Sequence, residues 1–76
     1  MTIAELHHLL VTTLVRVRGD SRTKWRRAVG EIKVYSLSTH PHCNWEVRPA
    51  GTIIEIAAVE QAVDTVRADH PWVVQD

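Results

Sequence analysis

The sequence has 76 residues and lacks several features that would assign it to a class. It contains a single cysteine, Cys43, so no intramolecular disulfide framework can stabilise the fold. No apolar run approaches the ~18–20 residues of a membrane-spanning helix. The N-terminus has no Lys or Arg ahead of an apolar run, so we expect no secretory signal peptide. We therefore expect a protein of the reducing cytoplasm.

Neither sign of charge is in excess, because nine Lys and Arg balance nine Asp and Glu. This balance excludes a generally basic nucleic-acid coat and an acidic tail. Apolar residues make up 45% of the chain, as in globular proteins. We expect residues 1–76 to form a single small domain, and a core of this size contributes only a few net kcal/mol. Added stability must then come from dense packing, a metal or a partner chain.

Phenylalanine is absent, and three tryptophans supply most of the aromatic surface. Trp25, Trp45 and Trp72 fall one in each third of the chain, which favours three elements meeting in one core. The alternative is an exposed tryptophan that anchors an interface. We expect this first of Trp72, which is close to the last residue.

The pattern predicts a first amphipathic helix from about Thr2 to Val17. Thr2 and Glu5 have the spacing of a capping box, and Gly19 is a stop signal. A second, short helix is predicted from the N-cap at Asp20-Ser21 to about Val29. The apolar positions of the first helix recur at three- and four-residue spacing: Ile3, Leu6, Leu9, Leu10, Leu14 and Val17.

Two strands are predicted next, at about 32–37 and 44–48, joined by a hairpin tip at 38–43. In the tip we expect Pro41 to fix the turn and Asn44 to bond the loop backbone. Trp45 should point into the core beside Val47, because residues two apart on a strand share a face. The same rule puts Glu46 and Arg48 on the opposite, wetter face.

A third helix is predicted to begin at Thr52, which has capping-box spacing to Glu55, and to stop before Pro71. The alternative is that Thr52 to Ile56 extends as a third strand and the helix begins near Ala57. Either way, the order α-α-β-β-α predicts an α+β fold with helices packed on an antiparallel sheet of two, or three, strands.

The hairpin tip concentrates residues with metal-binding chemistry. A zinc site would have to be built from His40, His42 and Cys43, with His70 as a fourth ligand. The spacing matches no standard zinc pattern, and adjacent ligands strain a tetrahedral site. We therefore assign no metal or other cofactor. A Cys43 nucleophile activated by a neighbouring histidine is also disfavoured, because neighbours on a strand point to opposite faces and no oxyanion hole is evident. We expect no enzyme activity.

Charge is unevenly distributed along the chain. Residues 16–33 hold seven Lys or Arg and two acids, whereas residues 46–76 hold two Arg and six acids. Helix, turn, basic helix and hairpin is an order typical of a winged helix-turn-helix, which would bind nucleic acid through Arg22, Lys24, Arg26 and Arg27. The alternative is a solvated basic face partly paired with three acids, Glu60, Asp64 and Asp69.

The segments THPHCNW (39–45) and DTVRADHP (64–71) resemble short bacterial proteins of uncharacterised function. The resemblance covers about residues 24–71 and implies a bacterial, cytoplasmic origin. It implies no activity, cofactor or partner, so no functional residue is carried over.

The sequence favours a non-enzymatic module that binds another protein or a second copy of itself. The apolar run Trp72-Val73-Val74, if exposed, would be its interface. The second hypothesis is the nucleic-acid-binding protein described above. No membrane association is expected.

Overall fold

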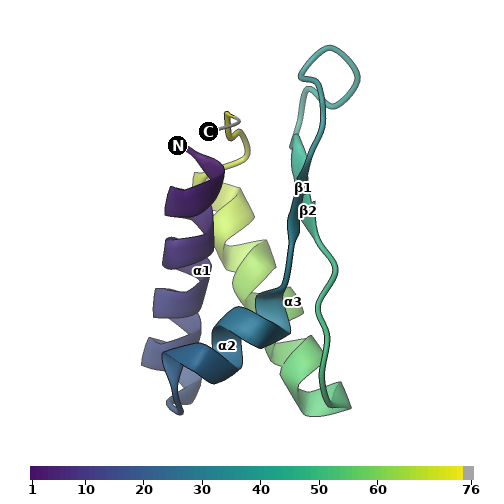
Figure 1. Cartoon of the computed structure of the whole chain (residues 1–76). Coiled ribbons are helices and arrows are strands. Elements are labelled where there is room, and N and C mark those ends of the chain that lie inside the picture. The colour runs from purple at the N-terminus through teal and green to yellow at the C-terminus, as the bar shows by residue number, and fades with distance from the viewer. Residues whose placement is uncertain (75–76) are drawn as a thin grey trace.

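A computed structural model describes residues 1–74 of the chain. Along the sequence it contains α1 (Ile3–Arg18), α2 (Arg22–Val29), β1 (Ile32–Val34), β2 (Trp45–Val47) and α3 (Ile53–Asp69). The predicted order α-α-β-β-α and the α+β class are confirmed (Figure 1). Within this range, no helix combines the length and the apolar composition that a membrane crossing requires.

Both long helices begin at the predicted capping boxes. At α3, the Glu55 amide donates to Thr52 Oγ1 (3.1 Å), and the Thr52 amide donates to Glu55 Oε1 (2.9 Å). Thr2 and Glu5 make the same pair of bonds at α1. These bonds satisfy amides that a helix start leaves unpaired. The alternative third strand at 52–56 is therefore wrong, and the sheet has two strands.

The hairpin ladder is shorter than predicted. The strands pair antiparallel over three residues each, with Val34 opposite Trp45 and Ile32 opposite Val47. Beyond this ladder the Tyr35 amide still donates to the Asn44 carbonyl (2.7 Å). The Ser36 carbonyl instead accepts from two amides of the tip, those of residues 39 and 40. The hydrogen bonds of the turn thus occupy backbone groups that a longer ladder would have to pair between the strands.

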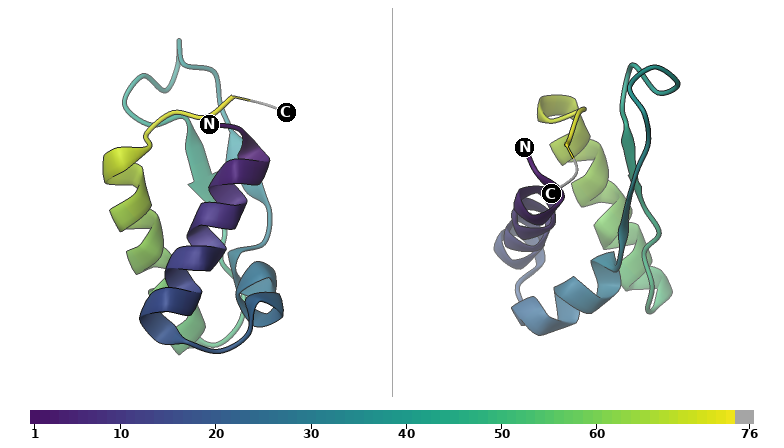
Figure 2. Two further views of the ribbon diagram at one scale, coloured as in Figure 1. Left: turned by 90° about the vertical axis from the view of Figure 1, so that its left-hand side faces the viewer. Right: turned by 45° about the horizontal axis from the view of Figure 1, so that its top comes forward.

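The core lies where the two long helices meet α2 and the hairpin. Figure 2 shows α1 and α3 side by side, α2 across one end of the pair, and the hairpin standing against α3. Trp25 and Trp45 are buried in the core, as expected, whereas the Trp72 side chain is 54% exposed. The largest fully buried side chains are Leu6, Leu10, Val11, Leu14, Val29 and Val59.

The segment after α3 is fixed in part by one buried polar side chain. Asn44 is 3% exposed and bonds both backbone groups of Val73: Oδ1 accepts from the amide, and Nδ2 donates to the carbonyl, each at 2.8 Å. Asn44 Nδ2 also donates to the Tyr35 carbonyl (3.2 Å). The next residue, Val74, donates to the Met1 carbonyl (2.9 Å). The segment is therefore held between the hairpin and the start of α1.

Candidate functional sites

The predictions for the hairpin are confirmed for Asn44 and Trp45. Asn44 bonds the loop backbone, and the Trp45 side chain points into the core with Val47 packed against the core from the same strand. Of the two residues expected on the wetter face, Arg48 is exposed and Glu46 is half-buried, because Glu46 accepts a hydrogen bond from the Tyr35 hydroxyl. The sequence did not predict the bonds from Asn44 to Val73, because those residues are 29 apart in the chain.

The four zinc candidates do not converge. His40 stacks on Tyr35, with ring centroids 4.3 Å apart, and its Nδ1 lies 2.9 Å from the Thr39 hydroxyl. The Cys43 thiol donates to the Trp45 carbonyl (3.4 Å). His42 is exposed. Among residues 1–74 no group of three His, Cys, Asp or Glu side chains is placed to hold a metal ion.

Two of those candidates instead line a shallow hollow between the hairpin and the C-terminal half of α3. We call it the hairpin hollow, and its volume is about 240 Å³. The guanidinium of Arg67 lies over the Trp45 ring, with its carbon 5.1 Å from the ring centroid. The hollow is lined by Tyr35, His40, Cys43, Trp45, Glu46 and Arg67.

Glu46 already has two partners at the edge of this hollow. Its Oε1 accepts from the Tyr35 hydroxyl, and the Arg48 guanidinium lies 3.8 Å from the same oxygen. The hydrogen bond to Glu46 raises the pKa of Tyr35, because the carboxylate stabilises the protonated phenol. The phenol and the carboxylate therefore act as one hydrogen-bonded unit.

The four predicted nucleic-acid contacts lie on α2, but only two of them are unoccupied. Arg22 donates to Thr12 Oγ1 (3.2 Å) and lies 3.1 Å from Nδ1 of His8. The side chains of Arg26 and Arg27 are exposed and form no hydrogen bond or ion pair within residues 1–74. The alternative prediction was a solvated basic face partly paired with acids of α3. Its exposure is confirmed for Arg26 and Arg27, but the pairing is wrong, because within the same range none of the three acids forms an ion pair: Glu60, Asp64 and Asp69.

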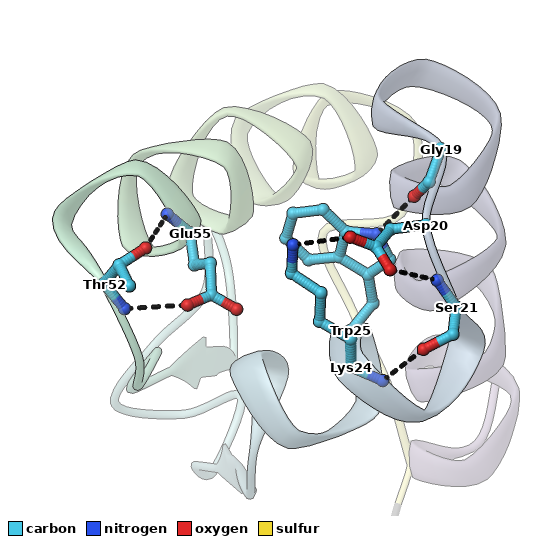
Figure 3. Close-up of polar contacts among 7 residues, drawn as sticks. All are labelled: Gly19, Asp20, Ser21, Lys24, Trp25, Thr52 and Glu55. Carbon is cyan, nitrogen blue, oxygen red and sulfur yellow. Dashed lines mark hydrogen bonds and ion pairs between the residues drawn. The ribbon is translucent and has the colours of Figure 1, made fainter.

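Lys24, the fourth of these residues, is tied down at the turn between α1 and α2 (Figure 3). Its Nζ is 2.7 Å from Asp20 Oδ2 and 5.2 Å from the Trp25 ring centroid. This contact lowers the pKa of Asp20 and raises that of Lys24. The indole of Trp25 donates to the Gly19 carbonyl (2.7 Å). The fourth cation is thus part of the turn and is not free for a partner.

The outer side of α1 and α3 forms a second candidate surface. A groove of about 140 Å³ runs between the helices, with Leu14, Ala58 and Ala62 among its lining residues. Ile54 precedes Ala58 by four residues, so it continues the same side of α3, and it is 76% exposed. We define the α1–α3 face as a single set of residues: Thr13, Val17, Ile54, Ala58, Gln61, Ala62 and Thr65.

The predicted interface at the chain's end is only partly exposed. Val73 is 3% exposed and packs in the core, so its prediction as an interface residue is wrong. Its backbone lies in the clamp of Asn44, which turns the side chain inward. Trp72 and Val74 remain exposed, and the Trp72 indole donates to the Pro41 carbonyl (2.8 Å).

Comparisons with family models, with curated proteins and with solved structures found no match for this chain.

Proposed function

We propose that this protein is a non-enzymatic protein-binding module of the bacterial cytoplasm, and that its α1–α3 face packs against a second copy of the chain. One observation carries the proposal: the α1–α3 face has no charged residue, and the cation at the rim of its groove, Arg18, is bonded to Gln61 (2.8 Å). The outer side of a surface helix is ordinarily charged. Exposed apolar side chains on such a side, here Val17 and Ile54, mark an interaction surface.

A second copy fits this surface because the face carries both protruding and recessed parts. Ile54 and Val17 protrude, whereas Ala58 and Ala62 leave a groove beside them. A two-fold contact uses the same patch on both subunits, so each copy must supply both parts. Burial of this patch would also add apolar contact to a chain whose own core is small.

Two neighbouring residues supply a matched test. Ile53 and Ile54 are both in the first turn of α3, and they are 86% and 76% exposed. Successive helical residues point about 100° apart, so only Ile54 shares the side of Ala58. A glutamate is equally compatible with the helix dipole at either position. Ile54→Glu should therefore disrupt the contact, and Ile53→Glu should leave it intact.

Sedimentation velocity from micromolar to millimolar concentration should show a dimer for the wild type and for Ile53→Glu. The dissociation constant of Ile54→Glu should rise at least about tenfold, which corresponds to roughly 1.4 kcal/mol. A wild type that remains monomeric over the whole range would remove the proposal. Equal weakening by both variants would show that the contact does not use the α1–α3 face.

The second candidate function, nucleic-acid binding, has one observation in its favour. Arg26 and Arg27 project from α2 without a partner among residues 1–74, and such free cations can neutralise phosphates. Binding would weaken steeply with salt, and Arg26→Gln together with Arg27→Gln would reduce the salt dependence. No retardation of random duplex or single strands at about 50 mM salt would exclude this function.

A further inference from the structure

Arg67 is unusual among the charged side chains of this protein. Its Nε is buried and has no hydrogen-bond partner. Among the half-buried and buried side chains of residues 1–74, it is the only buried nitrogen or oxygen atom without one. Its guanidinium forms no ion pair in that range, although Glu46 and Asp64 both line the hollow on its other side. Buried polar groups are ordinarily satisfied, so an exception calls for an explanation. Here an arginine is held in place without a counter-ion.

The position of Arg67 is fixed by packing. Its guanidinium lies on the Trp45 ring, and the Trp45 indole donates to the His70 carbonyl (2.9 Å) at the end of the same helix. A guanidinium over an aromatic face is attracted to the ring, and N–H groups that point away from the ring can still bond a ligand. An arginine fixed in this way loses little conformational entropy when it binds an anion.

We propose that the hairpin hollow binds a small organic carboxylate attached to a flat ring, with the carboxylate on Arg67 and the ring against the Tyr35–His40 pair. Guanidinium and carboxylate form paired, parallel hydrogen bonds. Tyr35 and His40, whose rings stack on each other, both line the hollow and give it aromatic surface. The proposal does not depend on self-association, because none of these residues belongs to the α1–α3 face.

The charge of the hollow favours a monoanion over a phosphate. Arg67 supplies one positive charge, and Glu46, with its negative charge shared between Tyr35 and Arg48, lines the same space. The single negative charge of a carboxylate would balance the positive charge of Arg67. A second negative charge, as on phosphate, would be repelled by Glu46 with no further cation to offset it. The volume of about 240 Å³ is below that of drug-sized pockets, so the ligand must be as small as benzoate.

The test is a titration of the full chain with sodium benzoate, followed by NMR of the three indole N–H groups and of Arg67 Nε–H at constant ionic strength. Parallel titrations use inorganic phosphate and sodium chloride. We expect saturable shifts of Trp45 and Arg67 with a Kd on the order of 1 mM, as for a ligand of this size. Trp25, at the other end of the molecule, and Trp72 should not move.

Two exposed histidines separated by one residue supply matched variants. His40→Ala removes part of the aromatic side and should weaken benzoate binding several-fold, whereas His42→Ala, outside the hollow, should not. Arg67→Gln should abolish the shift of Trp45, and Arg67→Lys should weaken binding about tenfold, because lysine lacks the planar fork.

Three results would overturn the proposal. Equal shifts with chloride would show an effect of salt alone. Phosphate binding as tight as benzoate binding would show a general oxyanion site without preference for a carboxylate. Equal effects of His40→Ala and His42→Ala would show that benzoate does not bind in the hairpin hollow.

Discussion

The two ends of this molecule are held together by different means. At the end that carries the hairpin tip, the first residue and the last described residues, the buried Asn44 side chain joins the hairpin to the last described segment, and the indoles of Trp45 and Trp72 add further bonds. At the opposite end, the turn of residues 19–21 and the start of α3 are held by exposed caps and by the Lys24–Asp20 ion pair (Figure 3). The first end depends on a few buried bonds, and the second on many exposed ones.

This difference indicates where each end can tolerate change. Water cannot reach a buried amide with three hydrogen bonds to replace a lost partner. Removal of the amide therefore leaves several buried groups without a hydrogen bond, which destabilises the fold. Exposed caps and ion pairs can be replaced by water at small cost. We therefore expect the hairpin end to be sensitive to single substitutions and the α2 end to accept them, which leaves Arg26 and Arg27 free to serve a partner.

The largest expected effect is that of Asn44→Ala. The substitution leaves both backbone groups of Val73 without partners, and an unsatisfied buried group costs about 1–3 kcal/mol. We expect the free energy of unfolding to fall by about 3 kcal/mol or more in urea denaturation. A loss below about 1 kcal/mol would mean that water takes the place of the amide and that the two ends do not differ.

The next effect compares tryptophans at the two ends. The Trp45 indole donates to the His70 carbonyl and the Trp25 indole to the Gly19 carbonyl, and both rings are buried. Replacement of either by phenylalanine should cost about 2 kcal/mol, from a lost hydrogen bond and lost packing volume. The exposed Trp72 makes a similar bond, and Trp72→Phe should cost less than about 1 kcal/mol, with all three variants measured by urea denaturation.

A smaller effect is expected at the caps. Thr52→Ala removes the hydroxyl that accepts the Glu55 amide and should cost about 1 kcal/mol. Thr52→Ser keeps the hydroxyl and is the control, which should remain within a few tenths of a kcal/mol of the wild type. Equal losses in the two variants would show that the methyl group, and not the cap, stabilises the start of α3.

The smallest effect is the response to acid. Bonds from Thr2 and Thr52 lower the pKa of Glu5 and Glu55, and the bond from Lys24 lowers that of Asp20. A carboxyl group whose pKa is lowered by folding stabilises the folded state at pH values above its unfolded-state pKa, which is about 4 to 4.5. This stabilisation is lost as the pH falls through the folded-state pKa. Melting temperature should therefore decline below about pH 4.5. Glu55→Gln should flatten that decline, and an unchanged slope would contradict the assignment.

Local signals in the sequence predicted most of the fold. The capping boxes at Thr2 and Thr52 placed both long helices within about one residue, because the donors and acceptors involved are three residues apart. The third-strand alternative failed for the same reason, since that cap commits residues 52–55 to a helix start. The hairpin was predicted in position but not in length.

The candidate sites were harder to predict because they join distant parts of the chain. Arg67 was not singled out, and its contact with Trp45 depends on how the hairpin packs on α3. Val73 was expected at the surface because its neighbours are apolar, and only the bonds from Asn44 explain its burial. The weak signal available was Asn44 itself, a polar residue placed where a strand enters the core.

The hydrogen bond between Val74 and Met1 brings the first residue and the last described residues side by side (Figure 2). The path of the chain is therefore almost a closed loop, so the chain could be joined here and opened at another exposed position. A circular permutant that joins residue 76 to residue 1 through a short glycine-serine linker, and opens the chain within the exposed tip at residues 38–42, should keep the same packing. Such a molecule would have its ends on the hairpin, where a fused reporter would lie away from α2.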